Sequence, residues 1–437
     1  MEILNFKFDK KNFERLLSYN SLNFSKTLVE MFLSVASFTL TFGSIWTDNL
    51  PTGPLAPVVI PKHPSPNWSW DTIPLSLHGA VKTRSFTTEE IKHLAKYDMY
   101  TAEKWYTPCG SQGPTQSGPS CAIESKTEAL YKQIKAINPK QTTILYWNSM
   151  FDFAFYTAHQ HMLDLEAQGI HAFLRDETGE IISLCNDGNV YCNITTFDIT
   201  QPAVRKLWVD TVVNATASGY VDGIFADHST GNGVFIGNVD KNGQAPNQLC
   251  NGKGAGRLCY NFTNEFTTSF NSWHMWATNY TQDILSKTTG GPVIQGPYAR
   301  MGQLNAKNAS RGVDPCNFDE LREAYADPIY NEYTNSSVNI IEASHRGTRS
   351  CIPTEKCLAA YLTAVKPYTY LHCGYNKDKL IPDTYFPEMD YPLGEPESDA
   401  VETAPGSNVW TRKFKSGTHT QWDNNKKTGT VSWAKTE

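Results

Sequence analysis

The stretch GYVDGIFADH, residues 219–228, decides the fold class. Its apolar run at 221–226 is typical of a strand that is buried on both faces of a parallel sheet, and the segment 200–218 before it predicts a helix that ends at the glycine. Ligands of α/β folds bind at the carboxyl ends of parallel strands. We therefore expect acid/base chemistry at Asp227 and His228. In the alternative interpretation, Asp227 only caps the next turn.

Seven further segments read as strands, at 73–79, 98–105, 142–148, 171–176, 292–296, 338–344 and 368–374. Capping boxes at 87–90 and 125–128, and a proline at 202, mark helix starts between them. Eight strands alternating with helices over about 300 residues predict a (β/α)8 TIM barrel. The alternative is a doubly wound open sheet, but no GxGxxG phosphate turn follows the first strand.

The barrel is expected at residues 71–390, between two segments of different composition. Residues 1–47 form a leader whose apolar core at 31–44 predicts a signal peptide, with translation starting at Met1 or Met31, or else a signal anchor. The proline spacing of residues 48–70 predicts an extended linker. Residues 391–437 predict antiparallel strands at 409–415 and 428–433, joined around 423–425, which form a small C-terminal β appendage packed on the barrel.

Composition points to a globular protein of the secretory pathway. The chain of 437 residues is 40% hydrophobic and 19% charged, and its net charge of -6 without a polybasic block argues against nucleic-acid binding. Ten cysteines and a series of N-x-S/T sequons favour a secreted, disulfide-bonded glycoprotein. We expect local pairs, Cys109 with Cys121, Cys185 with Cys192, Cys250 with Cys259 and Cys351 with Cys357, which leaves Cys316 and Cys373. The cysteine spacing does not suit zinc, so neither a metal nor another cofactor is expected.

Polar residues gather at the predicted strand ends, which a barrel brings to one mouth. Hydrolysis of a glycosidic bond needs two carboxyl groups, one as acid and one as nucleophile or base. Asp227 and Glu342 are the first candidate pair and Glu103 is the reserve, unless Glu103 is paired with Lys104 or Arg175. The remaining candidates, which would bind substrate, are His78, Trp105, Trp147, Asn148, Asp176, His228, Gln295, Tyr298, His345 and Arg346.

Three of these candidates are aromatic residues near predicted strand ends, where sugar rings stack on flat side chains, although aromatic side chains at a barrel mouth also pack under lids. His159 and His161 are spaced i, i+2 rather than at the i, i+4 of a zinc helix, and are interpreted as surface or packing residues. Ser229 and Ser344 lack a GxSxG elbow, which argues against a serine hydrolase.

A series of short motifs runs along the chain from about residue 75 to 434: FTTEEI at 86–91, Asp98, EKW at 103–105, YWNS at 146–149, LRD at 174–176, FDIT at 197–200, PAVR at 202–205, VDGIFAD at 221–227, YPLG at 391–394, WTRKF at 410–414 and GTV at 429–431. In these motifs the chain resembles the glycosyl-hydrolase-like TIM-barrel proteins, most closely the group numbered fifteen. The resemblance implies a (β/α)8 barrel that acts on a polysaccharide or glycan, with Asp227 as the strand-end acid.

These features together predict a secreted glycoside hydrolase, with a glycan as its partner, no stable membrane partner unless the leader is a signal anchor, and a monomeric state. A catalytically silent carbohydrate-binding or matrix barrel is the first alternative. A polysaccharide lyase is the second, with His228 or His345 as base beside Arg346 or Asn148. The sugar, its linkage and the stereochemical course do not follow from the sequence.

Overall fold

The computed structural model describes residues 68–79, 84–104, 122–186, 191–227, 248–250, 259–289, 291, 293–295, 316–326, 341–344, 354–367, 369–373 and 385–434. The expected leader, most of the linker and several site candidates lie outside these ranges. Those candidates are Trp105, His228, Tyr298, His345 and Arg346.

The centre of the fold is a parallel sheet whose strands follow one another in chain order. Seven strands are arranged as β10-β7-β3-β2-β1-β12-β11, so that β12, the last strand of this sheet along the chain, pairs with β1, the first. Every pairing in this sheet is parallel. This is the order of strands around a (β/α) barrel, and within the described residues the sheet is open between β10 and β11. The strands are β1 (Leu75–Gly79), β2 (Met99–Ala102), β3 (Thr142–Asn148), β7 (Gly223–Asp227), β10 (Val293–Gln295), β11 (Ile341–Ser344) and β12 (Thr369–Cys373).

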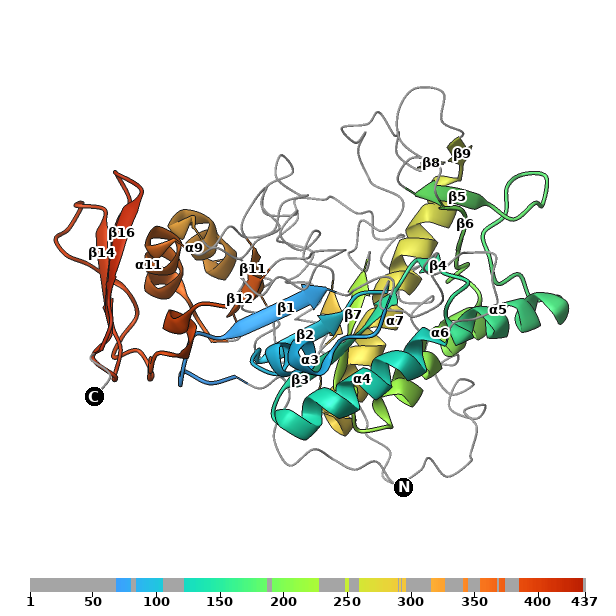
Figure 1. The fold of residues 1–437 in the computed structure, drawn as a ribbon. Coiled ribbons are helices and arrows are strands. Elements are labelled where there is room, and N and C mark those ends of the chain that lie inside the picture. Colours follow the sequence, from blue (N-terminus) through green and yellow to red (C-terminus); the bar gives the residue numbers. More distant parts are fainter. Residues whose placement is uncertain are drawn as a thin grey trace, which may run out of the picture. The chain divides into compact units, whose positions relative to one another are not determined.

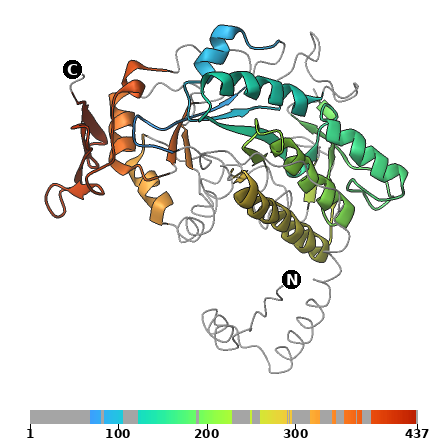
Figure 2. The ribbon, with the colours of Figure 1, turned by 90° about the horizontal axis from the view of Figure 1, so that it is seen from below.

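Helices connect the strands and lie along one face of the sheet (Figures 1 and 2). They are α3 (Thr88–Leu94), α4 (Ile123–Ile137), α6 (Pro202–Thr216), α7 (Asn264–Thr288), α9 (Phe318–Ala326) and α11 (Glu355–Ala364). The capping box of α3 is confirmed, because Thr87 and Glu90 exchange side-chain and backbone hydrogen bonds, and Pro202 is the first residue of α6. The box expected at 125–128 is wrong: α4 begins at Ile123, and the Ser125 hydroxyl donates to the Ala122 carbonyl instead.

The strand expected at 171–176 does not belong to this sheet, because β3 pairs directly with β7. Residues Ala172 and Leu174 hydrogen-bond to the backbone of Asp198 and Thr196, which ties the segment to a separate antiparallel sheet. Asp176 lies in an exposed turn, where its carboxylate accepts hydrogen bonds from Thr178. That sheet contains β4 (Phe151–Asp152), β6 (Tyr191–Thr196) and β5 (Ser183–Asn186), and α5 (Thr157–Ala167) lies between β4 and β5 in the chain.

The amino ends of the parallel strands are held by buried acids. Asp222, directly before β7, accepts hydrogen bonds from the backbone nitrogen and the hydroxyl of Thr143, and pairs with Lys135 at 2.7 Å. Asp98, directly before β2, accepts from the backbone nitrogen of Leu75 at 2.8 Å. Each acid therefore fixes one strand to its neighbour.

Another antiparallel sheet lies at the C-terminus and contacts α11. Its antiparallel order is β13-β14-β15-β16, formed by β13 (Val401–Glu402), β14 (Val409–Lys413), β15 (His419–Asp423) and β16 (Thr428–Ser432). The short helix η2 (Pro387–Asp390) precedes it. Buried Arg412 donates to the carbonyl groups of Leu362 and Val365 at the end of α11, which satisfies acceptors that a helix leaves open. Strand β15 was not predicted from the sequence.

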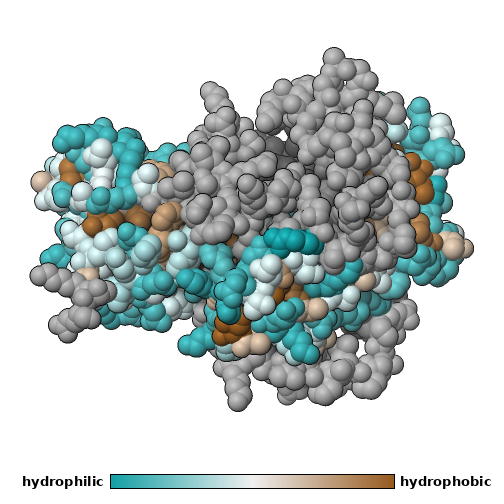
Figure 3. Space-filling model, in the orientation of Figure 1, coloured by the Kyte–Doolittle hydropathy of each residue, from teal (hydrophilic) through white to brown (hydrophobic). Residues whose placement is uncertain are grey.

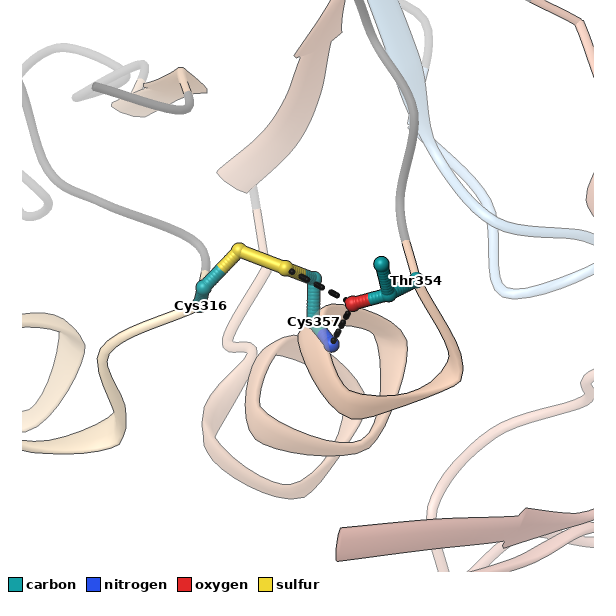
Figure 4. Close-up of a disulfide and its surroundings, with 3 residues drawn as sticks. All are labelled: Cys316, Thr354 and Cys357. Carbon is teal, nitrogen blue, oxygen red and sulfur yellow. Dashed lines mark hydrogen bonds between the residues drawn. A yellow bond between two sulfur atoms is a disulfide. The ribbon is translucent and has the colours of Figure 1, made fainter. Parts of the chain in front are cut away.

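A disulfide joins Cys316 to Cys357 and corrects the expected pair Cys351 with Cys357 (Figure 4). Cys316 precedes α9, Cys357 lies in the first turn of α11, and these two helices pack together. Thr354 caps α11 by accepting a hydrogen bond from the backbone nitrogen of Cys357. Elsewhere, the hairpin of β8 (Gln248–Cys250) and β9 (Cys259–Asn261) places Cys250 opposite Cys259, which is itself disulfide-bonded.

On the face drawn in Figure 3 the described surface is mostly hydrophilic, with hydrophobic residues in separate patches. Among the described residues, the large hydrophobic side chains that are exposed lie on different elements: Ile137 on α4, Leu163 on α5, Trp276 on α7 and Val401 on β13. None of the helices in the described ranges has both the length and the apolar character of a membrane span.

Candidate active site at the carboxyl ends of the parallel strands

Asp227 is the last residue of β7 and lies opposite Asn148, the last residue of β3. The side chain of Tyr146, two residues earlier on β3, reaches the same place because alternate residues of a strand share a face. The Tyr146 hydroxyl donates a hydrogen bond to Oδ2 of Asp227. This contact joins two neighbouring strands at their carboxyl ends, where α/β folds bind ligands.

The Tyr146 hydroxyl also accepts two hydrogen bonds, from Nζ of Lys104 at 2.9 Å and from Nδ2 of Asn148 at 3.2 Å. The orientation of the Asn148 amide is fixed, because its Oδ1 accepts from the backbone nitrogens of Met150 and Phe151 at 2.9 and 2.6 Å. A phenolic oxygen has one proton to donate. With its acceptor positions occupied, Tyr146 is oriented as a donor to Asp227.

The protonation state of Tyr146 agrees with its role as a hydrogen-bond donor to Asp227. Burial raises the pKa of its hydroxyl well above the usual value, and the negative charges of Asp227 and Glu103 raise it further. The hydroxyl therefore keeps its proton throughout the physiological range. A hydrogen bond donated to a carboxylate in turn favours the ionised form of Asp227.

Glu103 follows β2 and lies in the same network. Its carboxylate contacts Nε2 of His78 at 2.8 Å and Nζ of Lys104 at 2.5 Å, and the residue is 4% exposed. Burial has the largest single effect on the Glu103 pKa and would raise it, but Lys104 and His78 together outweigh burial and lower the pKa. Glu103 is therefore an ionised partner of Lys104, one of the two pairings that the sequence left open. Arg175, the other possible partner, pairs with Glu166 instead.

Aromatic rings enclose the polar network. Phe225 of β7 lies beneath it, with its ring 4.7 Å from the His78 ring and 5.7 Å from the Tyr146 ring. Nζ of Lys104 lies 4.2 Å from the centre of the Tyr146 ring and 5.7 Å from that of Phe153. In these low-dielectric surroundings the interactions between the charged groups are stronger than at an exposed surface.

The structure brings four of the predicted site residues together: His78, Glu103, Asn148 and Asp227. Trp147 is a correction, because it points to the opposite face of β3, where it is 2% exposed and packs against Tyr156 and Phe197. Asp176 is a second correction, because its turn belongs to the antiparallel region described above. Trp147 was chosen for its residue type, without regard to the alternation of side chains along β3. Asp176 was chosen because residues 171–176 were expected to form a strand of the parallel sheet.

Glu342 and Gln295 are placed by their backbone alone. Gln295 is the last residue of β10. Glu342, expected to close its strand, is the second residue of β11, which continues to Ser344. Glu342 thus lies opposite Tyr370, two residues before the strand ends.

Two residues of the network were missed as site candidates, Tyr146 and Lys104. Tyr146 shares the parity of Asn148 on an apolar strand, so alternation was a signal that could have identified it. Lys104 adjoins Glu103 in the sequence and was considered only as the partner of that acid. Within the described ranges, no group of three or more His, Cys, Asp or Glu side chains is arranged to hold a metal ion.

A family model described as hypothetical glycosyl hydrolase family 15 matches residues 135–418, more than half of the chain. This match confirms the family resemblance seen in the sequence. No curated protein sequence matches the chain.

Solved structures with similar folds include glycosidases. They include the alpha-galactosidase from Lactobacillus brevis (9% identity, TM-score 0.41, covering 81% of this chain and 46% of that chain) and the GH36 alpha-galactosidase AgaA from Geobacillus stearothermophilus (12%, 0.43, 80% and 47%). A third is the maltogenic alpha-amylase AmyB from Thermotoga neapolitana (11%, 0.42, 80% and 86%). The chain spans less than half the length of the two galactosidases.

Proposed function

Because the chain belongs to hypothetical glycosyl hydrolase family 15, we propose that it is a glycoside hydrolase that cleaves glycosidic bonds of a polysaccharide or glycan at the carboxyl ends of β1, β2, β3 and β7. The observation that carries the proposal is the hydrogen bond from the Tyr146 hydroxyl to Asp227 at the end of β7. It supports an ionised carboxylate, held in one orientation, where parallel strands end.

Asp227 is assigned the role of nucleophile or general base. Both roles need a carboxylate, whereas the general acid must be protonated before it acts. Tyr146 donates to Asp227 and accepts from Lys104 and Asn148. The hydrogen bond from Tyr146 favours the ionised form of Asp227, because a donated proton binds a carboxylate more strongly than it binds a neutral acid.

The general acid is assigned to a second carboxyl group, for which Glu342 remains the first candidate. Glu103 is less suitable, because its pKa is lowered by its pairing and a general acid needs a raised pKa. Glu103 instead balances the charge of Lys104, which in turn holds Tyr146. Removal of Glu103 should therefore affect the reaction through the network and not by loss of a proton donor.

A further part of the proposal concerns the setting in which the enzyme works: secreted, glycosylated and monomeric. The sequons at Asn214 and Asn261 support it, since both side chains are exposed. The Cys316–Cys357 disulfide supports an oxidising compartment.

The test is incubation of the purified secreted protein with a panel of polysaccharides and oligosaccharides, followed by product analysis. New reducing ends support hydrolysis, whereas an unsaturated sugar that absorbs in the ultraviolet would identify a lyase. Binding without products, at substrate concentrations that saturate the protein, would identify a carbohydrate-binding barrel.

Once a substrate is found, two measurements assign the acids. Asp227→Asn and Glu342→Gln should each reduce kcat by about 10²–10⁴-fold, and Glu103→Gln should reduce it less. If Asp227 is a nucleophile, azide should rescue Asp227→Ala and form a glycosyl azide of inverted configuration. Near-normal turnover of Asp227→Asn would refute the site.

A further inference from the structure

Ser149 follows Asn148 at the end of β3 and binds the main chain of Asp227 twice. The backbone nitrogen of Ser149 donates to the Asp227 carbonyl at 3.0 Å, and the Ser149 hydroxyl donates to the same oxygen at 2.7 Å. These bonds approach Asp227 from its backbone, whereas Tyr146 binds its carboxylate. Asp227 is therefore held at both ends.

A buried histidine of α7 completes this arrangement. Nε2 of His274 lies 2.7 Å from Oγ of Ser149, and the two residues are 1% and 2% exposed. Because the hydroxyl proton of Ser149 is directed to the Asp227 carbonyl, Nε2 of His274 must carry the proton of this contact and donate it. A serine whose proton is committed and whose side chain is buried is not a nucleophile, so this pair is not the dyad of a serine hydrolase.

Helix α7 is linked to both ends of β7, through Ser149 at the carboxyl end and through its C-cap Thr289 at the amino end. Near the carboxyl end, His274 follows an aromatic series at intervals of four residues, Phe262, Phe266 and Phe270, with ring centres 5.2 to 6.2 Å apart. At the amino end, the hydroxyl of Thr289 donates to the carbonyl of Asp222 at 2.8 Å. The helix is thus linked at two points, to Ser149 behind the candidate carboxylate and to Asp222 directly before β7.

We propose that His274 is a positioning residue, which acts through Ser149 to fix the main chain of Asp227 and hence the angle of its carboxylate to the substrate. This inference rests on the proposed function of Asp227. His274 lies on α7, far along the chain from the strand-end motifs, so those motifs do not reveal it. Misplacement of a reacting group by about 1 Å costs on the order of 10²-fold in rate.

The test compares variants at the two anchors of α7. Ser149→Ala and His274→Leu remove the contact behind Asp227, and His274→Gln restores a donor that can reach Ser149. Thr289→Val is the matched control, because it removes a hydroxyl-to-carbonyl bond between the same helix and the other end of the same strand. Circular dichroism and thermal unfolding show which variants are folded.

On the substrate found for the wild-type protein, Ser149→Ala and His274→Leu should lower kcat by about 10²-fold with KM nearly unchanged. His274→Gln should recover most of kcat, and Thr289→Val should lower the melting temperature while kcat stays near the wild-type value. Equal losses of kcat in His274→Leu and Thr289→Val, or no loss in Ser149→Ala, would overturn the positioning role.

If the wild-type protein hydrolyses no substrate, the proposed function fails and the positioning role is tested by a chemical probe. Labelling of Asp227 with a carbodiimide and glycine ethyl ester, followed by mass spectrometry, reports how the carboxylate is presented. Ser149→Ala and His274→Leu should change the labelling rate, and His274→Gln and Thr289→Val should not. An unchanged rate in the first two variants would refute the inference.

Discussion

The two ends of the parallel sheet use buried acids in different ways. At the amino ends, Asp98 and Asp222 accept hydrogen bonds from the backbone of the neighbouring strand. At the carboxyl ends, Glu103 and Asp227 contact the side chains of His78, Lys104 and Tyr146. Acids that bind backbone groups fasten strands together, whereas acids that bind other polar side chains create a site whose charges respond to one another.

Burial alone does not separate the two ends. Asp222 is 3% exposed and Glu103 is 4% exposed, and each pairs with a lysine at short distance. The difference lies in the next contact of each lysine. Lys135 donates to the Gln141 carbonyl, and Lys104 donates to the hydroxyl that holds Asp227. The partners of a buried acid therefore identify a candidate site better than its exposure does.

The largest effect should come from exchanging one acid at each end for its amide. Asp227→Asn should lower kcat by about 10²–10⁴-fold with little change in the melting temperature. Asp222→Asn should do the reverse, because it leaves Lys135 without its charged partner in a buried position, at a cost of about 3 kcal/mol in the free energy of unfolding. Kinetics and chemical denaturation of the two variants provide the measurement. A stability loss in Asp227→Asn equal to that of Asp222→Asn would erase the contrast between the ends.

The next effect is expected at Tyr146. Tyr146→Phe keeps the ring that stacks on Phe225 and removes the hydroxyl between Lys104 and Asp227. Loss of a donor to a carboxylate raises the pKa of that carboxylate, so the acidic limb of the pH profile of kcat should move to higher pH. We expect kcat to fall by about 10-fold or more at its optimum. Tyr97, two residues before β2 at the amino end, has its hydroxyl 3.4 Å from Nε2 of His93, so Tyr97→Phe is the control and should leave the profile in place.

A smaller effect concerns the charge balance at Glu103. In the wild-type protein the lowered pKa means that ionised Glu103 contributes stability above its unfolded pKa, and that this contribution is lost as the pH falls through the folded value. Lys104→Met leaves burial as the dominant influence and should raise the Glu103 pKa. In the wild-type protein Glu103 makes the fold more stable at neutral pH than at acidic pH. In Lys104→Met this contribution of Glu103 should disappear. Melting temperatures of the wild-type protein and the variant from about pH 3 to about pH 8, a range that spans the ordinary carboxyl pKa, measure this change in pH dependence. An unchanged pH dependence in Lys104→Met would show that His78 alone keeps Glu103 ionised.

The sequence predicted the elements whose signals are local. Apolar runs located the strands of the parallel sheet, and the threonine and glutamate at 87 and 90 located the start of α3. The strand predicted at residues 171–176 was assigned to the wrong sheet, because its backbone partners are residues 180–182 and 196–198, and the composition of the segment does not encode them. The pairing of Cys316 with Cys357 was not predicted for a similar reason, since the two cysteines are 41 residues apart and meet only when α9 and α11 pack.

In the candidate site, too, the sequence predicted only the residues that a local signal marks. Strand-end position identified Asp227, Asn148, Glu103 and His78, because the ends of parallel strands converge whatever their side chains are. It did not reveal that a lysine and a tyrosine connect the two acids, nor that a histidine of α7 lies behind one of them. Those contacts depend on side-chain orientation in three dimensions. Alternation along β3 predicts one of them, Tyr146, and excludes Trp147.

The smallest effect on activity is expected at Asp98, at the amino end. Burial raises the Asp98 pKa to about 6, despite the hydrogen bond from the backbone nitrogen of Leu75. A carboxyl group whose pKa is raised on folding stabilises the protein fully below its unfolded pKa, and that contribution is lost as the pH rises through the folded value. Stability should therefore fall between about pH 4 and pH 6 through this residue.

Asp98→Asn should remove this loss, because asparagine keeps an oxygen that accepts from Leu75 and carries no charge to desolvate. We expect the variant to be more stable at pH 7 by about 3 kcal/mol, equal to the wild-type protein below about pH 4, and unchanged in kcat. Chemical denaturation at both pH values measures the difference. A stability gain that persists at low pH would mean that charge burial is not its cause. A loss of kcat would mean that the amino end also shapes the site, and the separation of the two ends would have to be abandoned.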